Sequence, residues 1–326
     1  MNQLTTLPRI ILGEEVTGMM IFPTLRCNLD CSFCLNEFDP NFTRVVPGEL
    51  TGEQWVRGLN RIESKLNVPV TFSGGEPFVH KDFVYIVKNL KQDLKIDILT
   101  NLMWKKKGIE RFISEISPEK ISRDVPYPQI RASYHPGESD PDELIANAKM
   151  LQNAGFKVGI FSVLYPSPQQ NTEIVKMQYR CANEGLLFRV KEFVGMYEGT
   201  LYGDYSKYPG ASFSKERKDV ACKTPELHVG PNGAVYRCHR DLYAKQFPIG
   251  HILDRDFQFD PKFTFCPNYG DCHPCDVKVK IDTYQRELRT IADIRFDDES
   301  VKNAPNIEYD PKAQRAISNL REVVGN

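Results

Sequence analysis

Residues 27–34 read Cys-Asn-Leu-Asp-Cys-Ser-Phe-Cys, which places three cysteines in a C-x3-C-x2-C pattern. The stretch follows a short apolar run that we predict to be a strand, so the three thiols lie on a loop. Three thiolates this close in sequence can converge on one metal centre. Zinc sites and four-iron clusters normally take four protein ligands, so three cysteines leave one coordination position for another ligand. On spacing alone, the alternative is a zinc loop that borrows a fourth ligand from elsewhere in the chain.

Short apolar runs and helix-like segments alternate around this stretch, between residues 17 and 195. Continuous apolar runs are typical of strands buried on both faces, and they predict strands at residues 19–23, 68–73, 96–100, 130–135, 158–165 and 187–193. Helical spacing of apolar residues predicts helices at residues 51–65, 80–94, 109–116, 141–153 and 171–183. This alternation indicates βαβ units and a parallel sheet, hence an α/β fold. The pattern leaves open whether the sheet is doubly wound or an incomplete α/β barrel.

Some helix ends carry their own signals. Residues 51–54 read Thr-Gly-Glu-Gln, which has the form of a capping box and predicts a helix start. Gly155 and Gly185 each follow a predicted helix by two residues, where a left-handed glycine commonly ends the helix.

A second motif ends the second predicted strand, where residues 73–77 read Ser-Gly-Gly-Glu-Pro. Paired glycines let a backbone approach a ligand closely, although the motif alone is also typical of a tight turn before a helix. The two motifs together, in this order and on these elements, resemble the radical SAM superfamily over about residues 17–195. The resemblance implies a partial (β/α)6 TIM-type barrel, which we place at residues 14–197. It also implies a [4Fe–4S] cluster on Cys27, Cys31 and Cys34, with the open iron bound by S-adenosylmethionine (SAM).

The resemblance also assigns residues that would touch SAM. Gly74, Gly75 and Glu76 would contact its amino group, and Phe33 would lie near its adenine. Members of the family split SAM with one electron from the reduced cluster, and the resulting 5′-deoxyadenosyl radical abstracts hydrogen from an unactivated C–H bond. The implied protein partner is a one-electron reductase such as flavodoxin or ferredoxin.

Two further places match the family less closely. Thr100-Asn101 ends the third predicted strand, where the family often has Thr-Asn-Gly, and Leu102 departs from that motif. In the fourth predicted strand, Ser133 and His135 are candidates to touch the ribose or the carboxylate of SAM. The alternative is that they are ordinary polar residues near a strand end.

A second group of cysteines lies later in the chain, at positions 222, 238, 266, 272 and 275. Residues 229–236 predict a hairpin with a tight Pro-Asn-Gly turn, which can bring its flanking cysteines together. Spacing alone does not separate structural zinc from an iron–sulfur cluster. The arrangement resembles the SPASM/twitch extensions of radical SAM enzymes, which implies an auxiliary [4Fe–4S] cluster on Cys222, Cys238, Cys272 and Cys275. We predict that Cys266 either replaces one of these ligands or stays free as a hydrogen-atom donor.

The composition changes after residue 197, where glycine, proline, tyrosine and cysteine become dense. We therefore place a small cysteine-rich twitch/SPASM-like domain at residues 198–285 and a helical tail at residues 286–326, with one helix at residues 311–324. Cys181 lies in a predicted helix far from both cysteine groups in sequence, and we expect it to be a buried structural thiol.

The composition of the 326-residue chain is that of a globular protein, with 41% hydrophobic and 26% charged residues. Its 42 basic and 43 acidic residues give a net charge of -1, which argues against nucleic acid or an anionic membrane as the main partner. No apolar run approaches the roughly 20 residues of a membrane-spanning helix, and the first residues lack the features of a secretory signal. Nine cysteines without a signal favour a reducing cytoplasm, where clustered thiols bind metal.

The sixth predicted strand carries polar residues that are unusual for a buried strand. Arg189 and Lys191 share one face, and if that face points inward the pair would attract an anionic or polyhydroxylated substrate. Placement on the outer surface is the alternative.

We therefore predict a radical SAM enzyme that oxidises or epimerises a small sugar- or cyclitol-like molecule, with help from the auxiliary cluster. The alternative is a peptide- or protein-modifying radical SAM enzyme. Many such relatives carry a peptide-binding domain ahead of the first strand, and about 18 residues precede it here, which disfavours that alternative.

Overall fold

A computed structural model describes residues 7–38, 42–203, 207–214, 216–281 and 288–296. The chain divides into two compact units, each assembled from two segments. The first unit contains residues 1–203 and 224–261, and the second contains residues 204–223 and 262–326.

The first unit is built on a nine-stranded sheet. In spatial order its strands are β14 (Gly250–His251), β13 (Ala234–Tyr236), β12 (Glu226–Val229), β2 (Gly18–Ile21), β4 (Val70–Phe72), β5 (Ile96–Thr100), β6 (Ile130–Tyr134), β7 (Val158–Leu164) and β8 (Leu187–Glu192). All neighbours from β12 to β8 are parallel, and β13 and β14 are antiparallel. The α/β fold and the six predicted strands are confirmed, and the strands occupy adjacent positions in chain order from β2 to β8.

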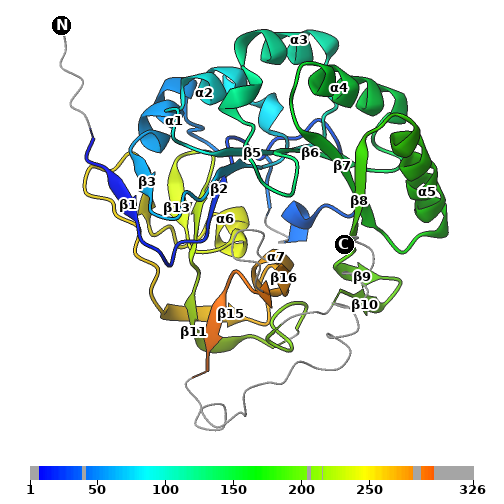
Figure 1. Ribbon diagram of the computed structural model, residues 1–326. Coiled ribbons are helices and arrows are strands. Elements are labelled where there is room, and N and C mark those ends of the chain that lie inside the picture. Colours follow the sequence, from blue (N-terminus) through cyan, green and yellow to red (C-terminus); the bar gives the residue numbers. More distant parts are fainter. Residues whose placement is uncertain (1–6, 39–41, 204–206, 215, 282–287, 297–326) are drawn as a thin grey trace, which may run out of the picture. The chain divides into compact units, whose positions relative to one another are not determined.

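Five helices alternate with these strands and lie in an arc along the sheet in Figure 1. They are α1 (Gly52–Leu59), α2 (Phe83–Asn89), α3 (Lys106–Glu115), α4 (Pro141–Asn153) and α5 (Pro168–Asn183). Trp55 of α1, Phe83 of α2 and Phe112 of α3 are fully buried in one hydrophobic core with the sheet. Cys181 of α5 belongs to the same core, as expected of a structural thiol.

The predicted capping box is present, because the Thr51 side chain accepts from the Gln54 N–H and the Gln54 side chain accepts from the Thr51 N–H. The helix is shorter than predicted and ends at Leu59. The next residues form β3 (Ile62–Ser64), which pairs in parallel with β1 (Ile10–Leu12). The buried Arg61 side chain donates to four backbone carbonyls, including those of Pro8 and Asp254, so it holds this segment out of the helix.

Several short elements complete the first unit. They are the 3-10 helices η1 (Leu35–Phe38), η2 (Pro77–Val79) and η3 (Pro118–Lys120), the helix α6 (His239–Ala244), and the hairpin of β9 (Gly195–Tyr197) with β10 (Thr200–Tyr202).

The second unit contains a three-stranded antiparallel sheet in the order β15 (Thr264–Tyr269), β11 (Lys218–Lys223) and β18 (Asp293–Arg295). It also holds α7 (Pro274–Val277) and the antiparallel pair β16 (Lys280–Ile281) and β17 (Leu288–Arg289). A small core of its own includes Val220, Cys222, Cys266 and Tyr269.

The domain boundaries differ from those predicted at 197/198 and 285/286. Residues 224–261 group with the first unit instead of with the cysteine-rich segment, because β12 pairs in parallel with β2 and its hairpin continues the large sheet. The predicted hairpin itself is confirmed as β12 and β13. The predicted helix at residues 311–324, and the tail beyond residue 296, lie outside the described residues.

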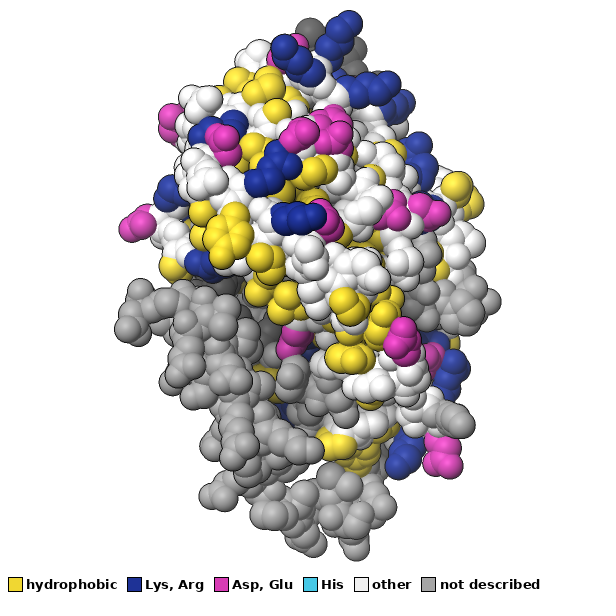
Figure 2. All heavy atoms as spheres, turned by 90° about the vertical axis from the view of Figure 1, so that its right-hand side faces the viewer, with side chains coloured by type: hydrophobic (Ala, Val, Ile, Leu, Met, Phe, Trp, Pro, Cys, Tyr) yellow, Lys and Arg dark blue, Asp and Glu magenta, His cyan; other side chains and the backbone are white. Residues whose placement is uncertain are grey.

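Figure 2 shows the face of the chain that carries α5 and β8 to β10. Basic and acidic side chains are interspersed there, which agrees with the near-balance of charges in the sequence. Exposed apolar residues on these elements include Tyr179 of α5 and Met196 and Leu201 of the β9–β10 hairpin. Among the described residues, no helix combines the length and the apolar character that crossing a membrane requires.

Candidate active site

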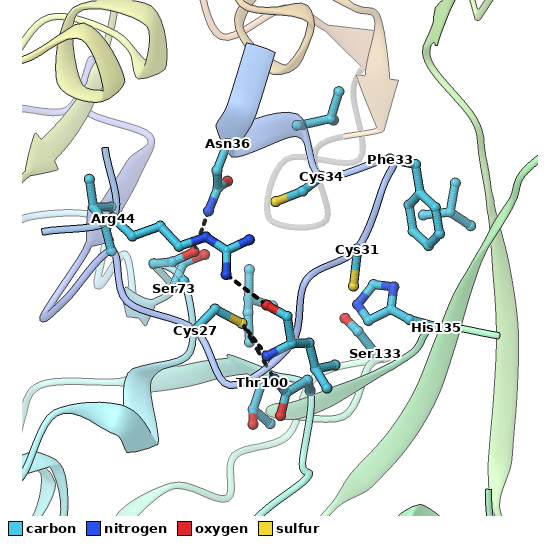
Figure 3. A pocket seen from close by; sticks show the side chains of 18 of the residues that line it. Cys27, Cys31, Phe33, Cys34, Asn36, Arg44, Ser73, Thr100, Ser133 and His135 are labelled. Atoms are coloured by element: carbon cyan, nitrogen blue, oxygen red, sulfur yellow. Dashed lines mark hydrogen bonds between the residues drawn. The ribbon is translucent and has the colours of Figure 1, made fainter. Parts of the chain in front are cut away.

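The three cysteines of the first motif lie together at a cavity of about 260 Å³ in the first unit. Strand β2 leads into the loop that carries Cys27, Cys31 and Cys34, and all three side chains are half-buried. Figure 3 shows their sulfur atoms turned toward the same space, with the Arg44 side chain extending between Cys27 and Cys34. The N–H of Cys34 donates to the Cys31 carbonyl over 3.0 Å, which closes the turn between the last two thiols.

The electrostatics of this loop favour a bound cation. Burial raises the pKa of the Cys31 thiol to about 12, and the neighbouring Cys34 and Cys27 thiolates add to the rise. Burial also raises the pKa of Cys27, against the opposing effect of the Leu29 N–H. Three thiolates crowded in a half-buried loop repel one another, so positive charge is needed to hold them deprotonated. A metal centre held by Cys27, Cys31 and Cys34 would supply that charge, and three thiolates fit a cluster with one open position.

The Gly-Gly pair of the second motif is required by the contact between two backbones. The N–H of Gly75 donates to the Thr24 carbonyl over 3.1 Å, and the N–H of Glu76 donates to the Arg26 carbonyl over 2.9 Å. A Cβ atom on Gly74, where φ is +138°, would lie 2.2 Å from the Thr24 oxygen, and one on Gly75 would lie 2.3 Å from the Arg26 oxygen. Only glycine fits at either position, so the motif clamps the segment that enters the cysteine loop.

The described contacts of Glu76 are all with protein groups, and its predicted contact with the amino group of SAM stays a prediction. Its carboxylate is buried and accepts from Thr100 Oγ1 at 2.8 Å, from the Asn101 N–H at 2.6 Å, and from Trp104 Nε1 and the Phe78 N–H at 3.2 Å each. Burial raises its pKa to about 7. Gly74 and Gly75 line the cavity, whereas Glu76 is absent from its described lining and ties the end of β5 to the motif.

Three other predicted residues come together on the far side of the cavity. Phe33, Ser133 and His135 all line it, and Figure 3 shows the Phe33 ring beside His135. The Phe33 ring lies 5.4 Å from that of His135 and 5.2 Å from that of Tyr165, centroid to centroid. Burial lowers the pKa of His135 to about 4, so its imidazole is neutral at pH 7. Its Nδ1 atom is buried without a hydrogen-bond partner among the described residues, which leaves it available to a ligand.

Two polar residues at the cavity were not predicted from the sequence. Arg44 donates to the Leu29 carbonyl over 3.0 Å and to Asp30 Oδ1 over 2.5 Å, so it braces the cysteine loop and adds positive charge. Asn36 donates to the Gly74 carbonyl over 2.7 Å. Both residues follow the cysteine motif without a motif of their own, and only the folding of their segment over the cavity reveals them.

The strand register places Arg189 and Lys191 on the cavity side of the sheet. Arg189 pairs with Phe161 and Lys191 pairs with Val163, and neighbouring residues at the same level of parallel strands share a face. Val163 lines the cavity, as does Ser133, which pairs with Phe161. Arg189 and Lys191 lie beyond the described lining, on the same face.

The second cysteine group is divided between the two units. Cys222 of β11 and Cys266 of β15 lie in the core of the second unit, where Val220, two residues before Cys222, pairs with Cys266. Burial raises the pKa of Cys272, and the nearby Cys222 and Cys266 thiolates raise it further. Cys275 lies in the first turn of α7 in this unit, whereas Cys238 precedes α6 in the first unit. The structure therefore brings Cys222, Cys266 and Cys272 together.

Three clustered thiols on a loop at the carboxyl end of a parallel α/β sheet suit the class of enzymes that hold a metal cluster there. The sequence profile of the Radical SAM superfamily matches residues 21–177. Over these residues the chain is similar to the radical SAM superfamily, and the match supports a radical SAM enzyme.

Individual relatives agree with this family. A probable GTP 3',8-cyclase of Methanopyrus kandleri is 33% identical over 94 residues, which are 28% of this chain and 29% of that protein. A GTP 3',8-cyclase of Staphylococcus carnosus is 23% identical over 257 residues, 76% of this chain and 74% of that protein. The chain matches about a third of the length of the first curated relatives. The solved structure of native anSMEcpe with bound AdoMet and Kp18Cys peptide covers 93% of this chain and 99% of its own, with 16% identity and a TM-score of 0.50, a likeness of fold alone.

Proposed function

We propose that the cavity binds a [4Fe–4S] cluster on Cys27, Cys31 and Cys34 together with SAM, and that the enzyme removes a hydrogen atom from an anionic small molecule. The observation that carries this proposal is the convergence of three thiols on one cavity whose wall is completed by Gly74 and Gly75. When bound, the cluster and SAM together supply a 5′-deoxyadenosyl radical. The residues of the chain bind, orient and shield these groups.

The residues around the cavity suit the parts of SAM. The Gly-Gly pair in the cavity wall suits its amino group, and the Phe33 ring suits its adenine. Ser133 and the neutral His135 suit its ribose hydroxyls or carboxylate. Arg44 adds a cation within the cavity, which favours a carboxylate there. Six parallel strands joined by helices support a partial (β/α)6 barrel around this site.

We infer an anionic, hydroxyl-bearing substrate, with a nucleotide favoured over a neutral sugar or cyclitol. Arg189 and Lys191 lie on the cavity face of β8, where they would attract phosphate. The relatives named GTP 3',8-cyclase point in the same direction. Oxidation and epimerisation of a carbinol carbon are both compatible with this placement.

We further propose an auxiliary [4Fe–4S] cluster of twitch type in the second unit, with structural zinc as the alternative. Cys222, Cys266 and Cys272 support it by their proximity, and Cys275 of the same unit would be the fourth ligand. A flavodoxin- or ferredoxin-like reductase in the cytoplasm would deliver the electron that the site needs.

Anaerobic reconstitution with iron, sulfide and SAM tests the proposal. With a strong reductant the wild-type protein should form 5′-deoxyadenosine, and the Cys31→Ala variant should form none. Loss of iron from Cys31→Ala without loss of folded structure would confirm the ligand. Wild-type protein that binds only zinc, or that fails to cleave SAM, would contradict the proposal.

The substrate class needs a separate experiment. Deuterated nucleotides should transfer deuterium to 5′-deoxyadenosine, and the double change Arg189→Gln with Lys191→Gln should raise KM several-fold. The control is Lys176→Gln on α5, whose exposed side chain pairs with Glu173, and it should leave KM unchanged. Deuterium transfer only from neutral sugars, or only from a peptide, would sink the nucleotide assignment while leaving the radical SAM assignment intact.

A further inference from the structure

We propose that Asn101 is a positioning residue that tunes the reduction potential of the cluster through an N–H···S hydrogen bond to Cys27. This inference rests on the proposed cluster site. Asn101 Nδ2 lies 3.7 Å from Cys27 Sγ, and the Leu29 N–H lies 3.5 Å from the same sulfur. The sequence suggested only that Thr100-Asn101 ends the third predicted strand at a place that partly matches a family motif.

The orientation of the Asn101 amide is fixed by its neighbours. Its Oδ1 accepts from the Met103 N–H over 2.9 Å, so this end of the amide must be the oxygen. Its Nδ2 donates to Asn28 Oδ1 over 2.7 Å, and Asn28 in turn donates to the Met103 carbonyl. A flipped amide would place two donors face to face at Met103. The nitrogen therefore points toward Cys27.

The backbone around Asn101 is also held. Its N–H donates to the buried Glu76 carboxylate over 2.6 Å, which links the second motif to the cysteine loop. Leu102 adopts the left-handed region with φ of +55°, and this turn brings the Met103 N–H back to the Asn101 side chain. Asn147 of α4 donates to the carbonyls of Leu102 and Trp104 and so fixes the same loop from behind. Asn101 is 6% exposed, so it has little freedom to turn away from the sulfur.

This geometry has a consequence for the cluster. A hydrogen bond to a ligating sulfur withdraws electron density and stabilises the reduced, more negative cluster. Glu76 then acts through Asn101 as part of the support of the cysteine loop, in addition to any contact with SAM. Loss of the Asn101 donor should make the cluster harder to reduce.

The test measures the midpoint potential of the reconstituted cluster by EPR-monitored redox titration, without SAM or substrate. Asn101→Leu removes the donor without adding charge, and Asn101→Asp keeps the acceptor for Met103 while removing the donor. Both should shift the potential to more negative values and lower the fraction reduced at a fixed solution potential several-fold. The matched control is Asn147→Leu, which loosens the same loop without touching the sulfur and should leave the potential unchanged.

The outcomes separate this inference from the proposed function. If the wild-type protein assembles no iron–sulfur cluster, the proposed function fails. If the cluster assembles and both Asn101 variants keep the wild-type potential, the inference fails. An equal shift in Asn147→Leu would also overturn it, because loop displacement would then explain the effect. Failure of both Asn101 variants to hold a cluster, with Asn147→Leu intact, would replace tuning by a purely structural role.

Discussion

At the scale of single residues, the neutral His135 gives a pH-dependent contribution to stability. Its pKa falls from an ordinary value of 6.5 to about 4 because it is buried. Between these values the unfolded chain binds more protons than the folded one, so the free energy of unfolding falls as the pH falls from 7 to 4. The contribution lost is on the order of 3 kcal/mol.

Replacement of His135 should remove this part of the pH dependence. In urea unfolding of the metal-free protein, His135→Gln should lose less stability than the wild type between pH 7 and pH 4.5. The difference between the two proteins is the relevant quantity, because every other titrating group is common to both. Parallel stability curves for the two proteins would contradict the assignment of a buried neutral imidazole.

Leu102 has a backbone conformation that the sequence did not predict. From the sequence it was a departure from a family motif, and nothing indicated its backbone conformation. The structure puts it in the left-handed region that glycine adopts without cost, with its side chain fully buried. The left-handed conformation costs a leucine roughly 1–2 kcal/mol, whereas burial of its side chain contributes a similar or larger amount. Leucine is therefore tolerated there because the core compensates for the backbone.

At the scale of elements, the approach of the Gly-Gly loop to the cysteine loop decides whether the site forms. Gly75→Ala would place a Cβ atom 2.3 Å from the Arg26 carbonyl oxygen, so the two backbones would have to separate. We expect the reconstituted variant to retain little of the iron held by Cys27, Cys31 and Cys34, while most of the fold remains. Iron content per chain and the urea midpoint measure the two effects.

Gly108→Ala is the matched control for this change. Gly108 lies in α3, and the nearest atom to its added Cβ would be Trp104 Cβ at 3.9 Å. This substitution should stabilise the helix by about 0.5–1 kcal/mol and leave the iron content unchanged. Full iron in Gly75→Ala would show that the close approach is not needed for the site.

Local sequence signals predicted the bounds of some helices correctly and those of others incorrectly. Helix α4 was predicted with its observed bounds from its apolar spacing and Gly155, which has φ of +94°, and the structure adds a cap by Asp140 at its start. Helix α1 was predicted too long, since the pairing of β3 with β1 involves residues about 50 positions away. In the same way the cysteine and Gly-Gly motifs identified the thiols and glycines of the cavity wall, whereas Arg44 and the amide network of Asn101 depend on contacts between distant segments.

At the scale of the whole molecule, the chain crosses three times between its two units. The turn residues predict the hairpin of β12 and β13, but they do not identify the strand that pairs with β12. In the structure that strand is β2. The cysteine-rich segment was therefore predicted as one module, whereas the structure interrupts it with residues 224–261. Two separate segments, residues 204–223 and 262–326, make the second unit.

Cys266 lies where those two segments pair, and its role there can be tested. Cys222 comes from one segment and Cys266 from the other, and the pairing of β11 with β15 brings them together beside Cys272.

If Cys266 is a ligand, Cys266→Ser should lower the iron content by about one four-iron cluster, while the EPR signal of the cluster on Cys27, Cys31 and Cys34 persists. Cys181→Ser, in the core of the other unit, should leave both clusters in place. Unchanged iron in Cys266→Ser, together with a change in the stereochemistry of the product, would instead make Cys266 a hydrogen-atom donor. We expect the ligand outcome because Cys222, Cys266 and Cys272 lie close together, and a shared metal would relieve the repulsion between their thiolates.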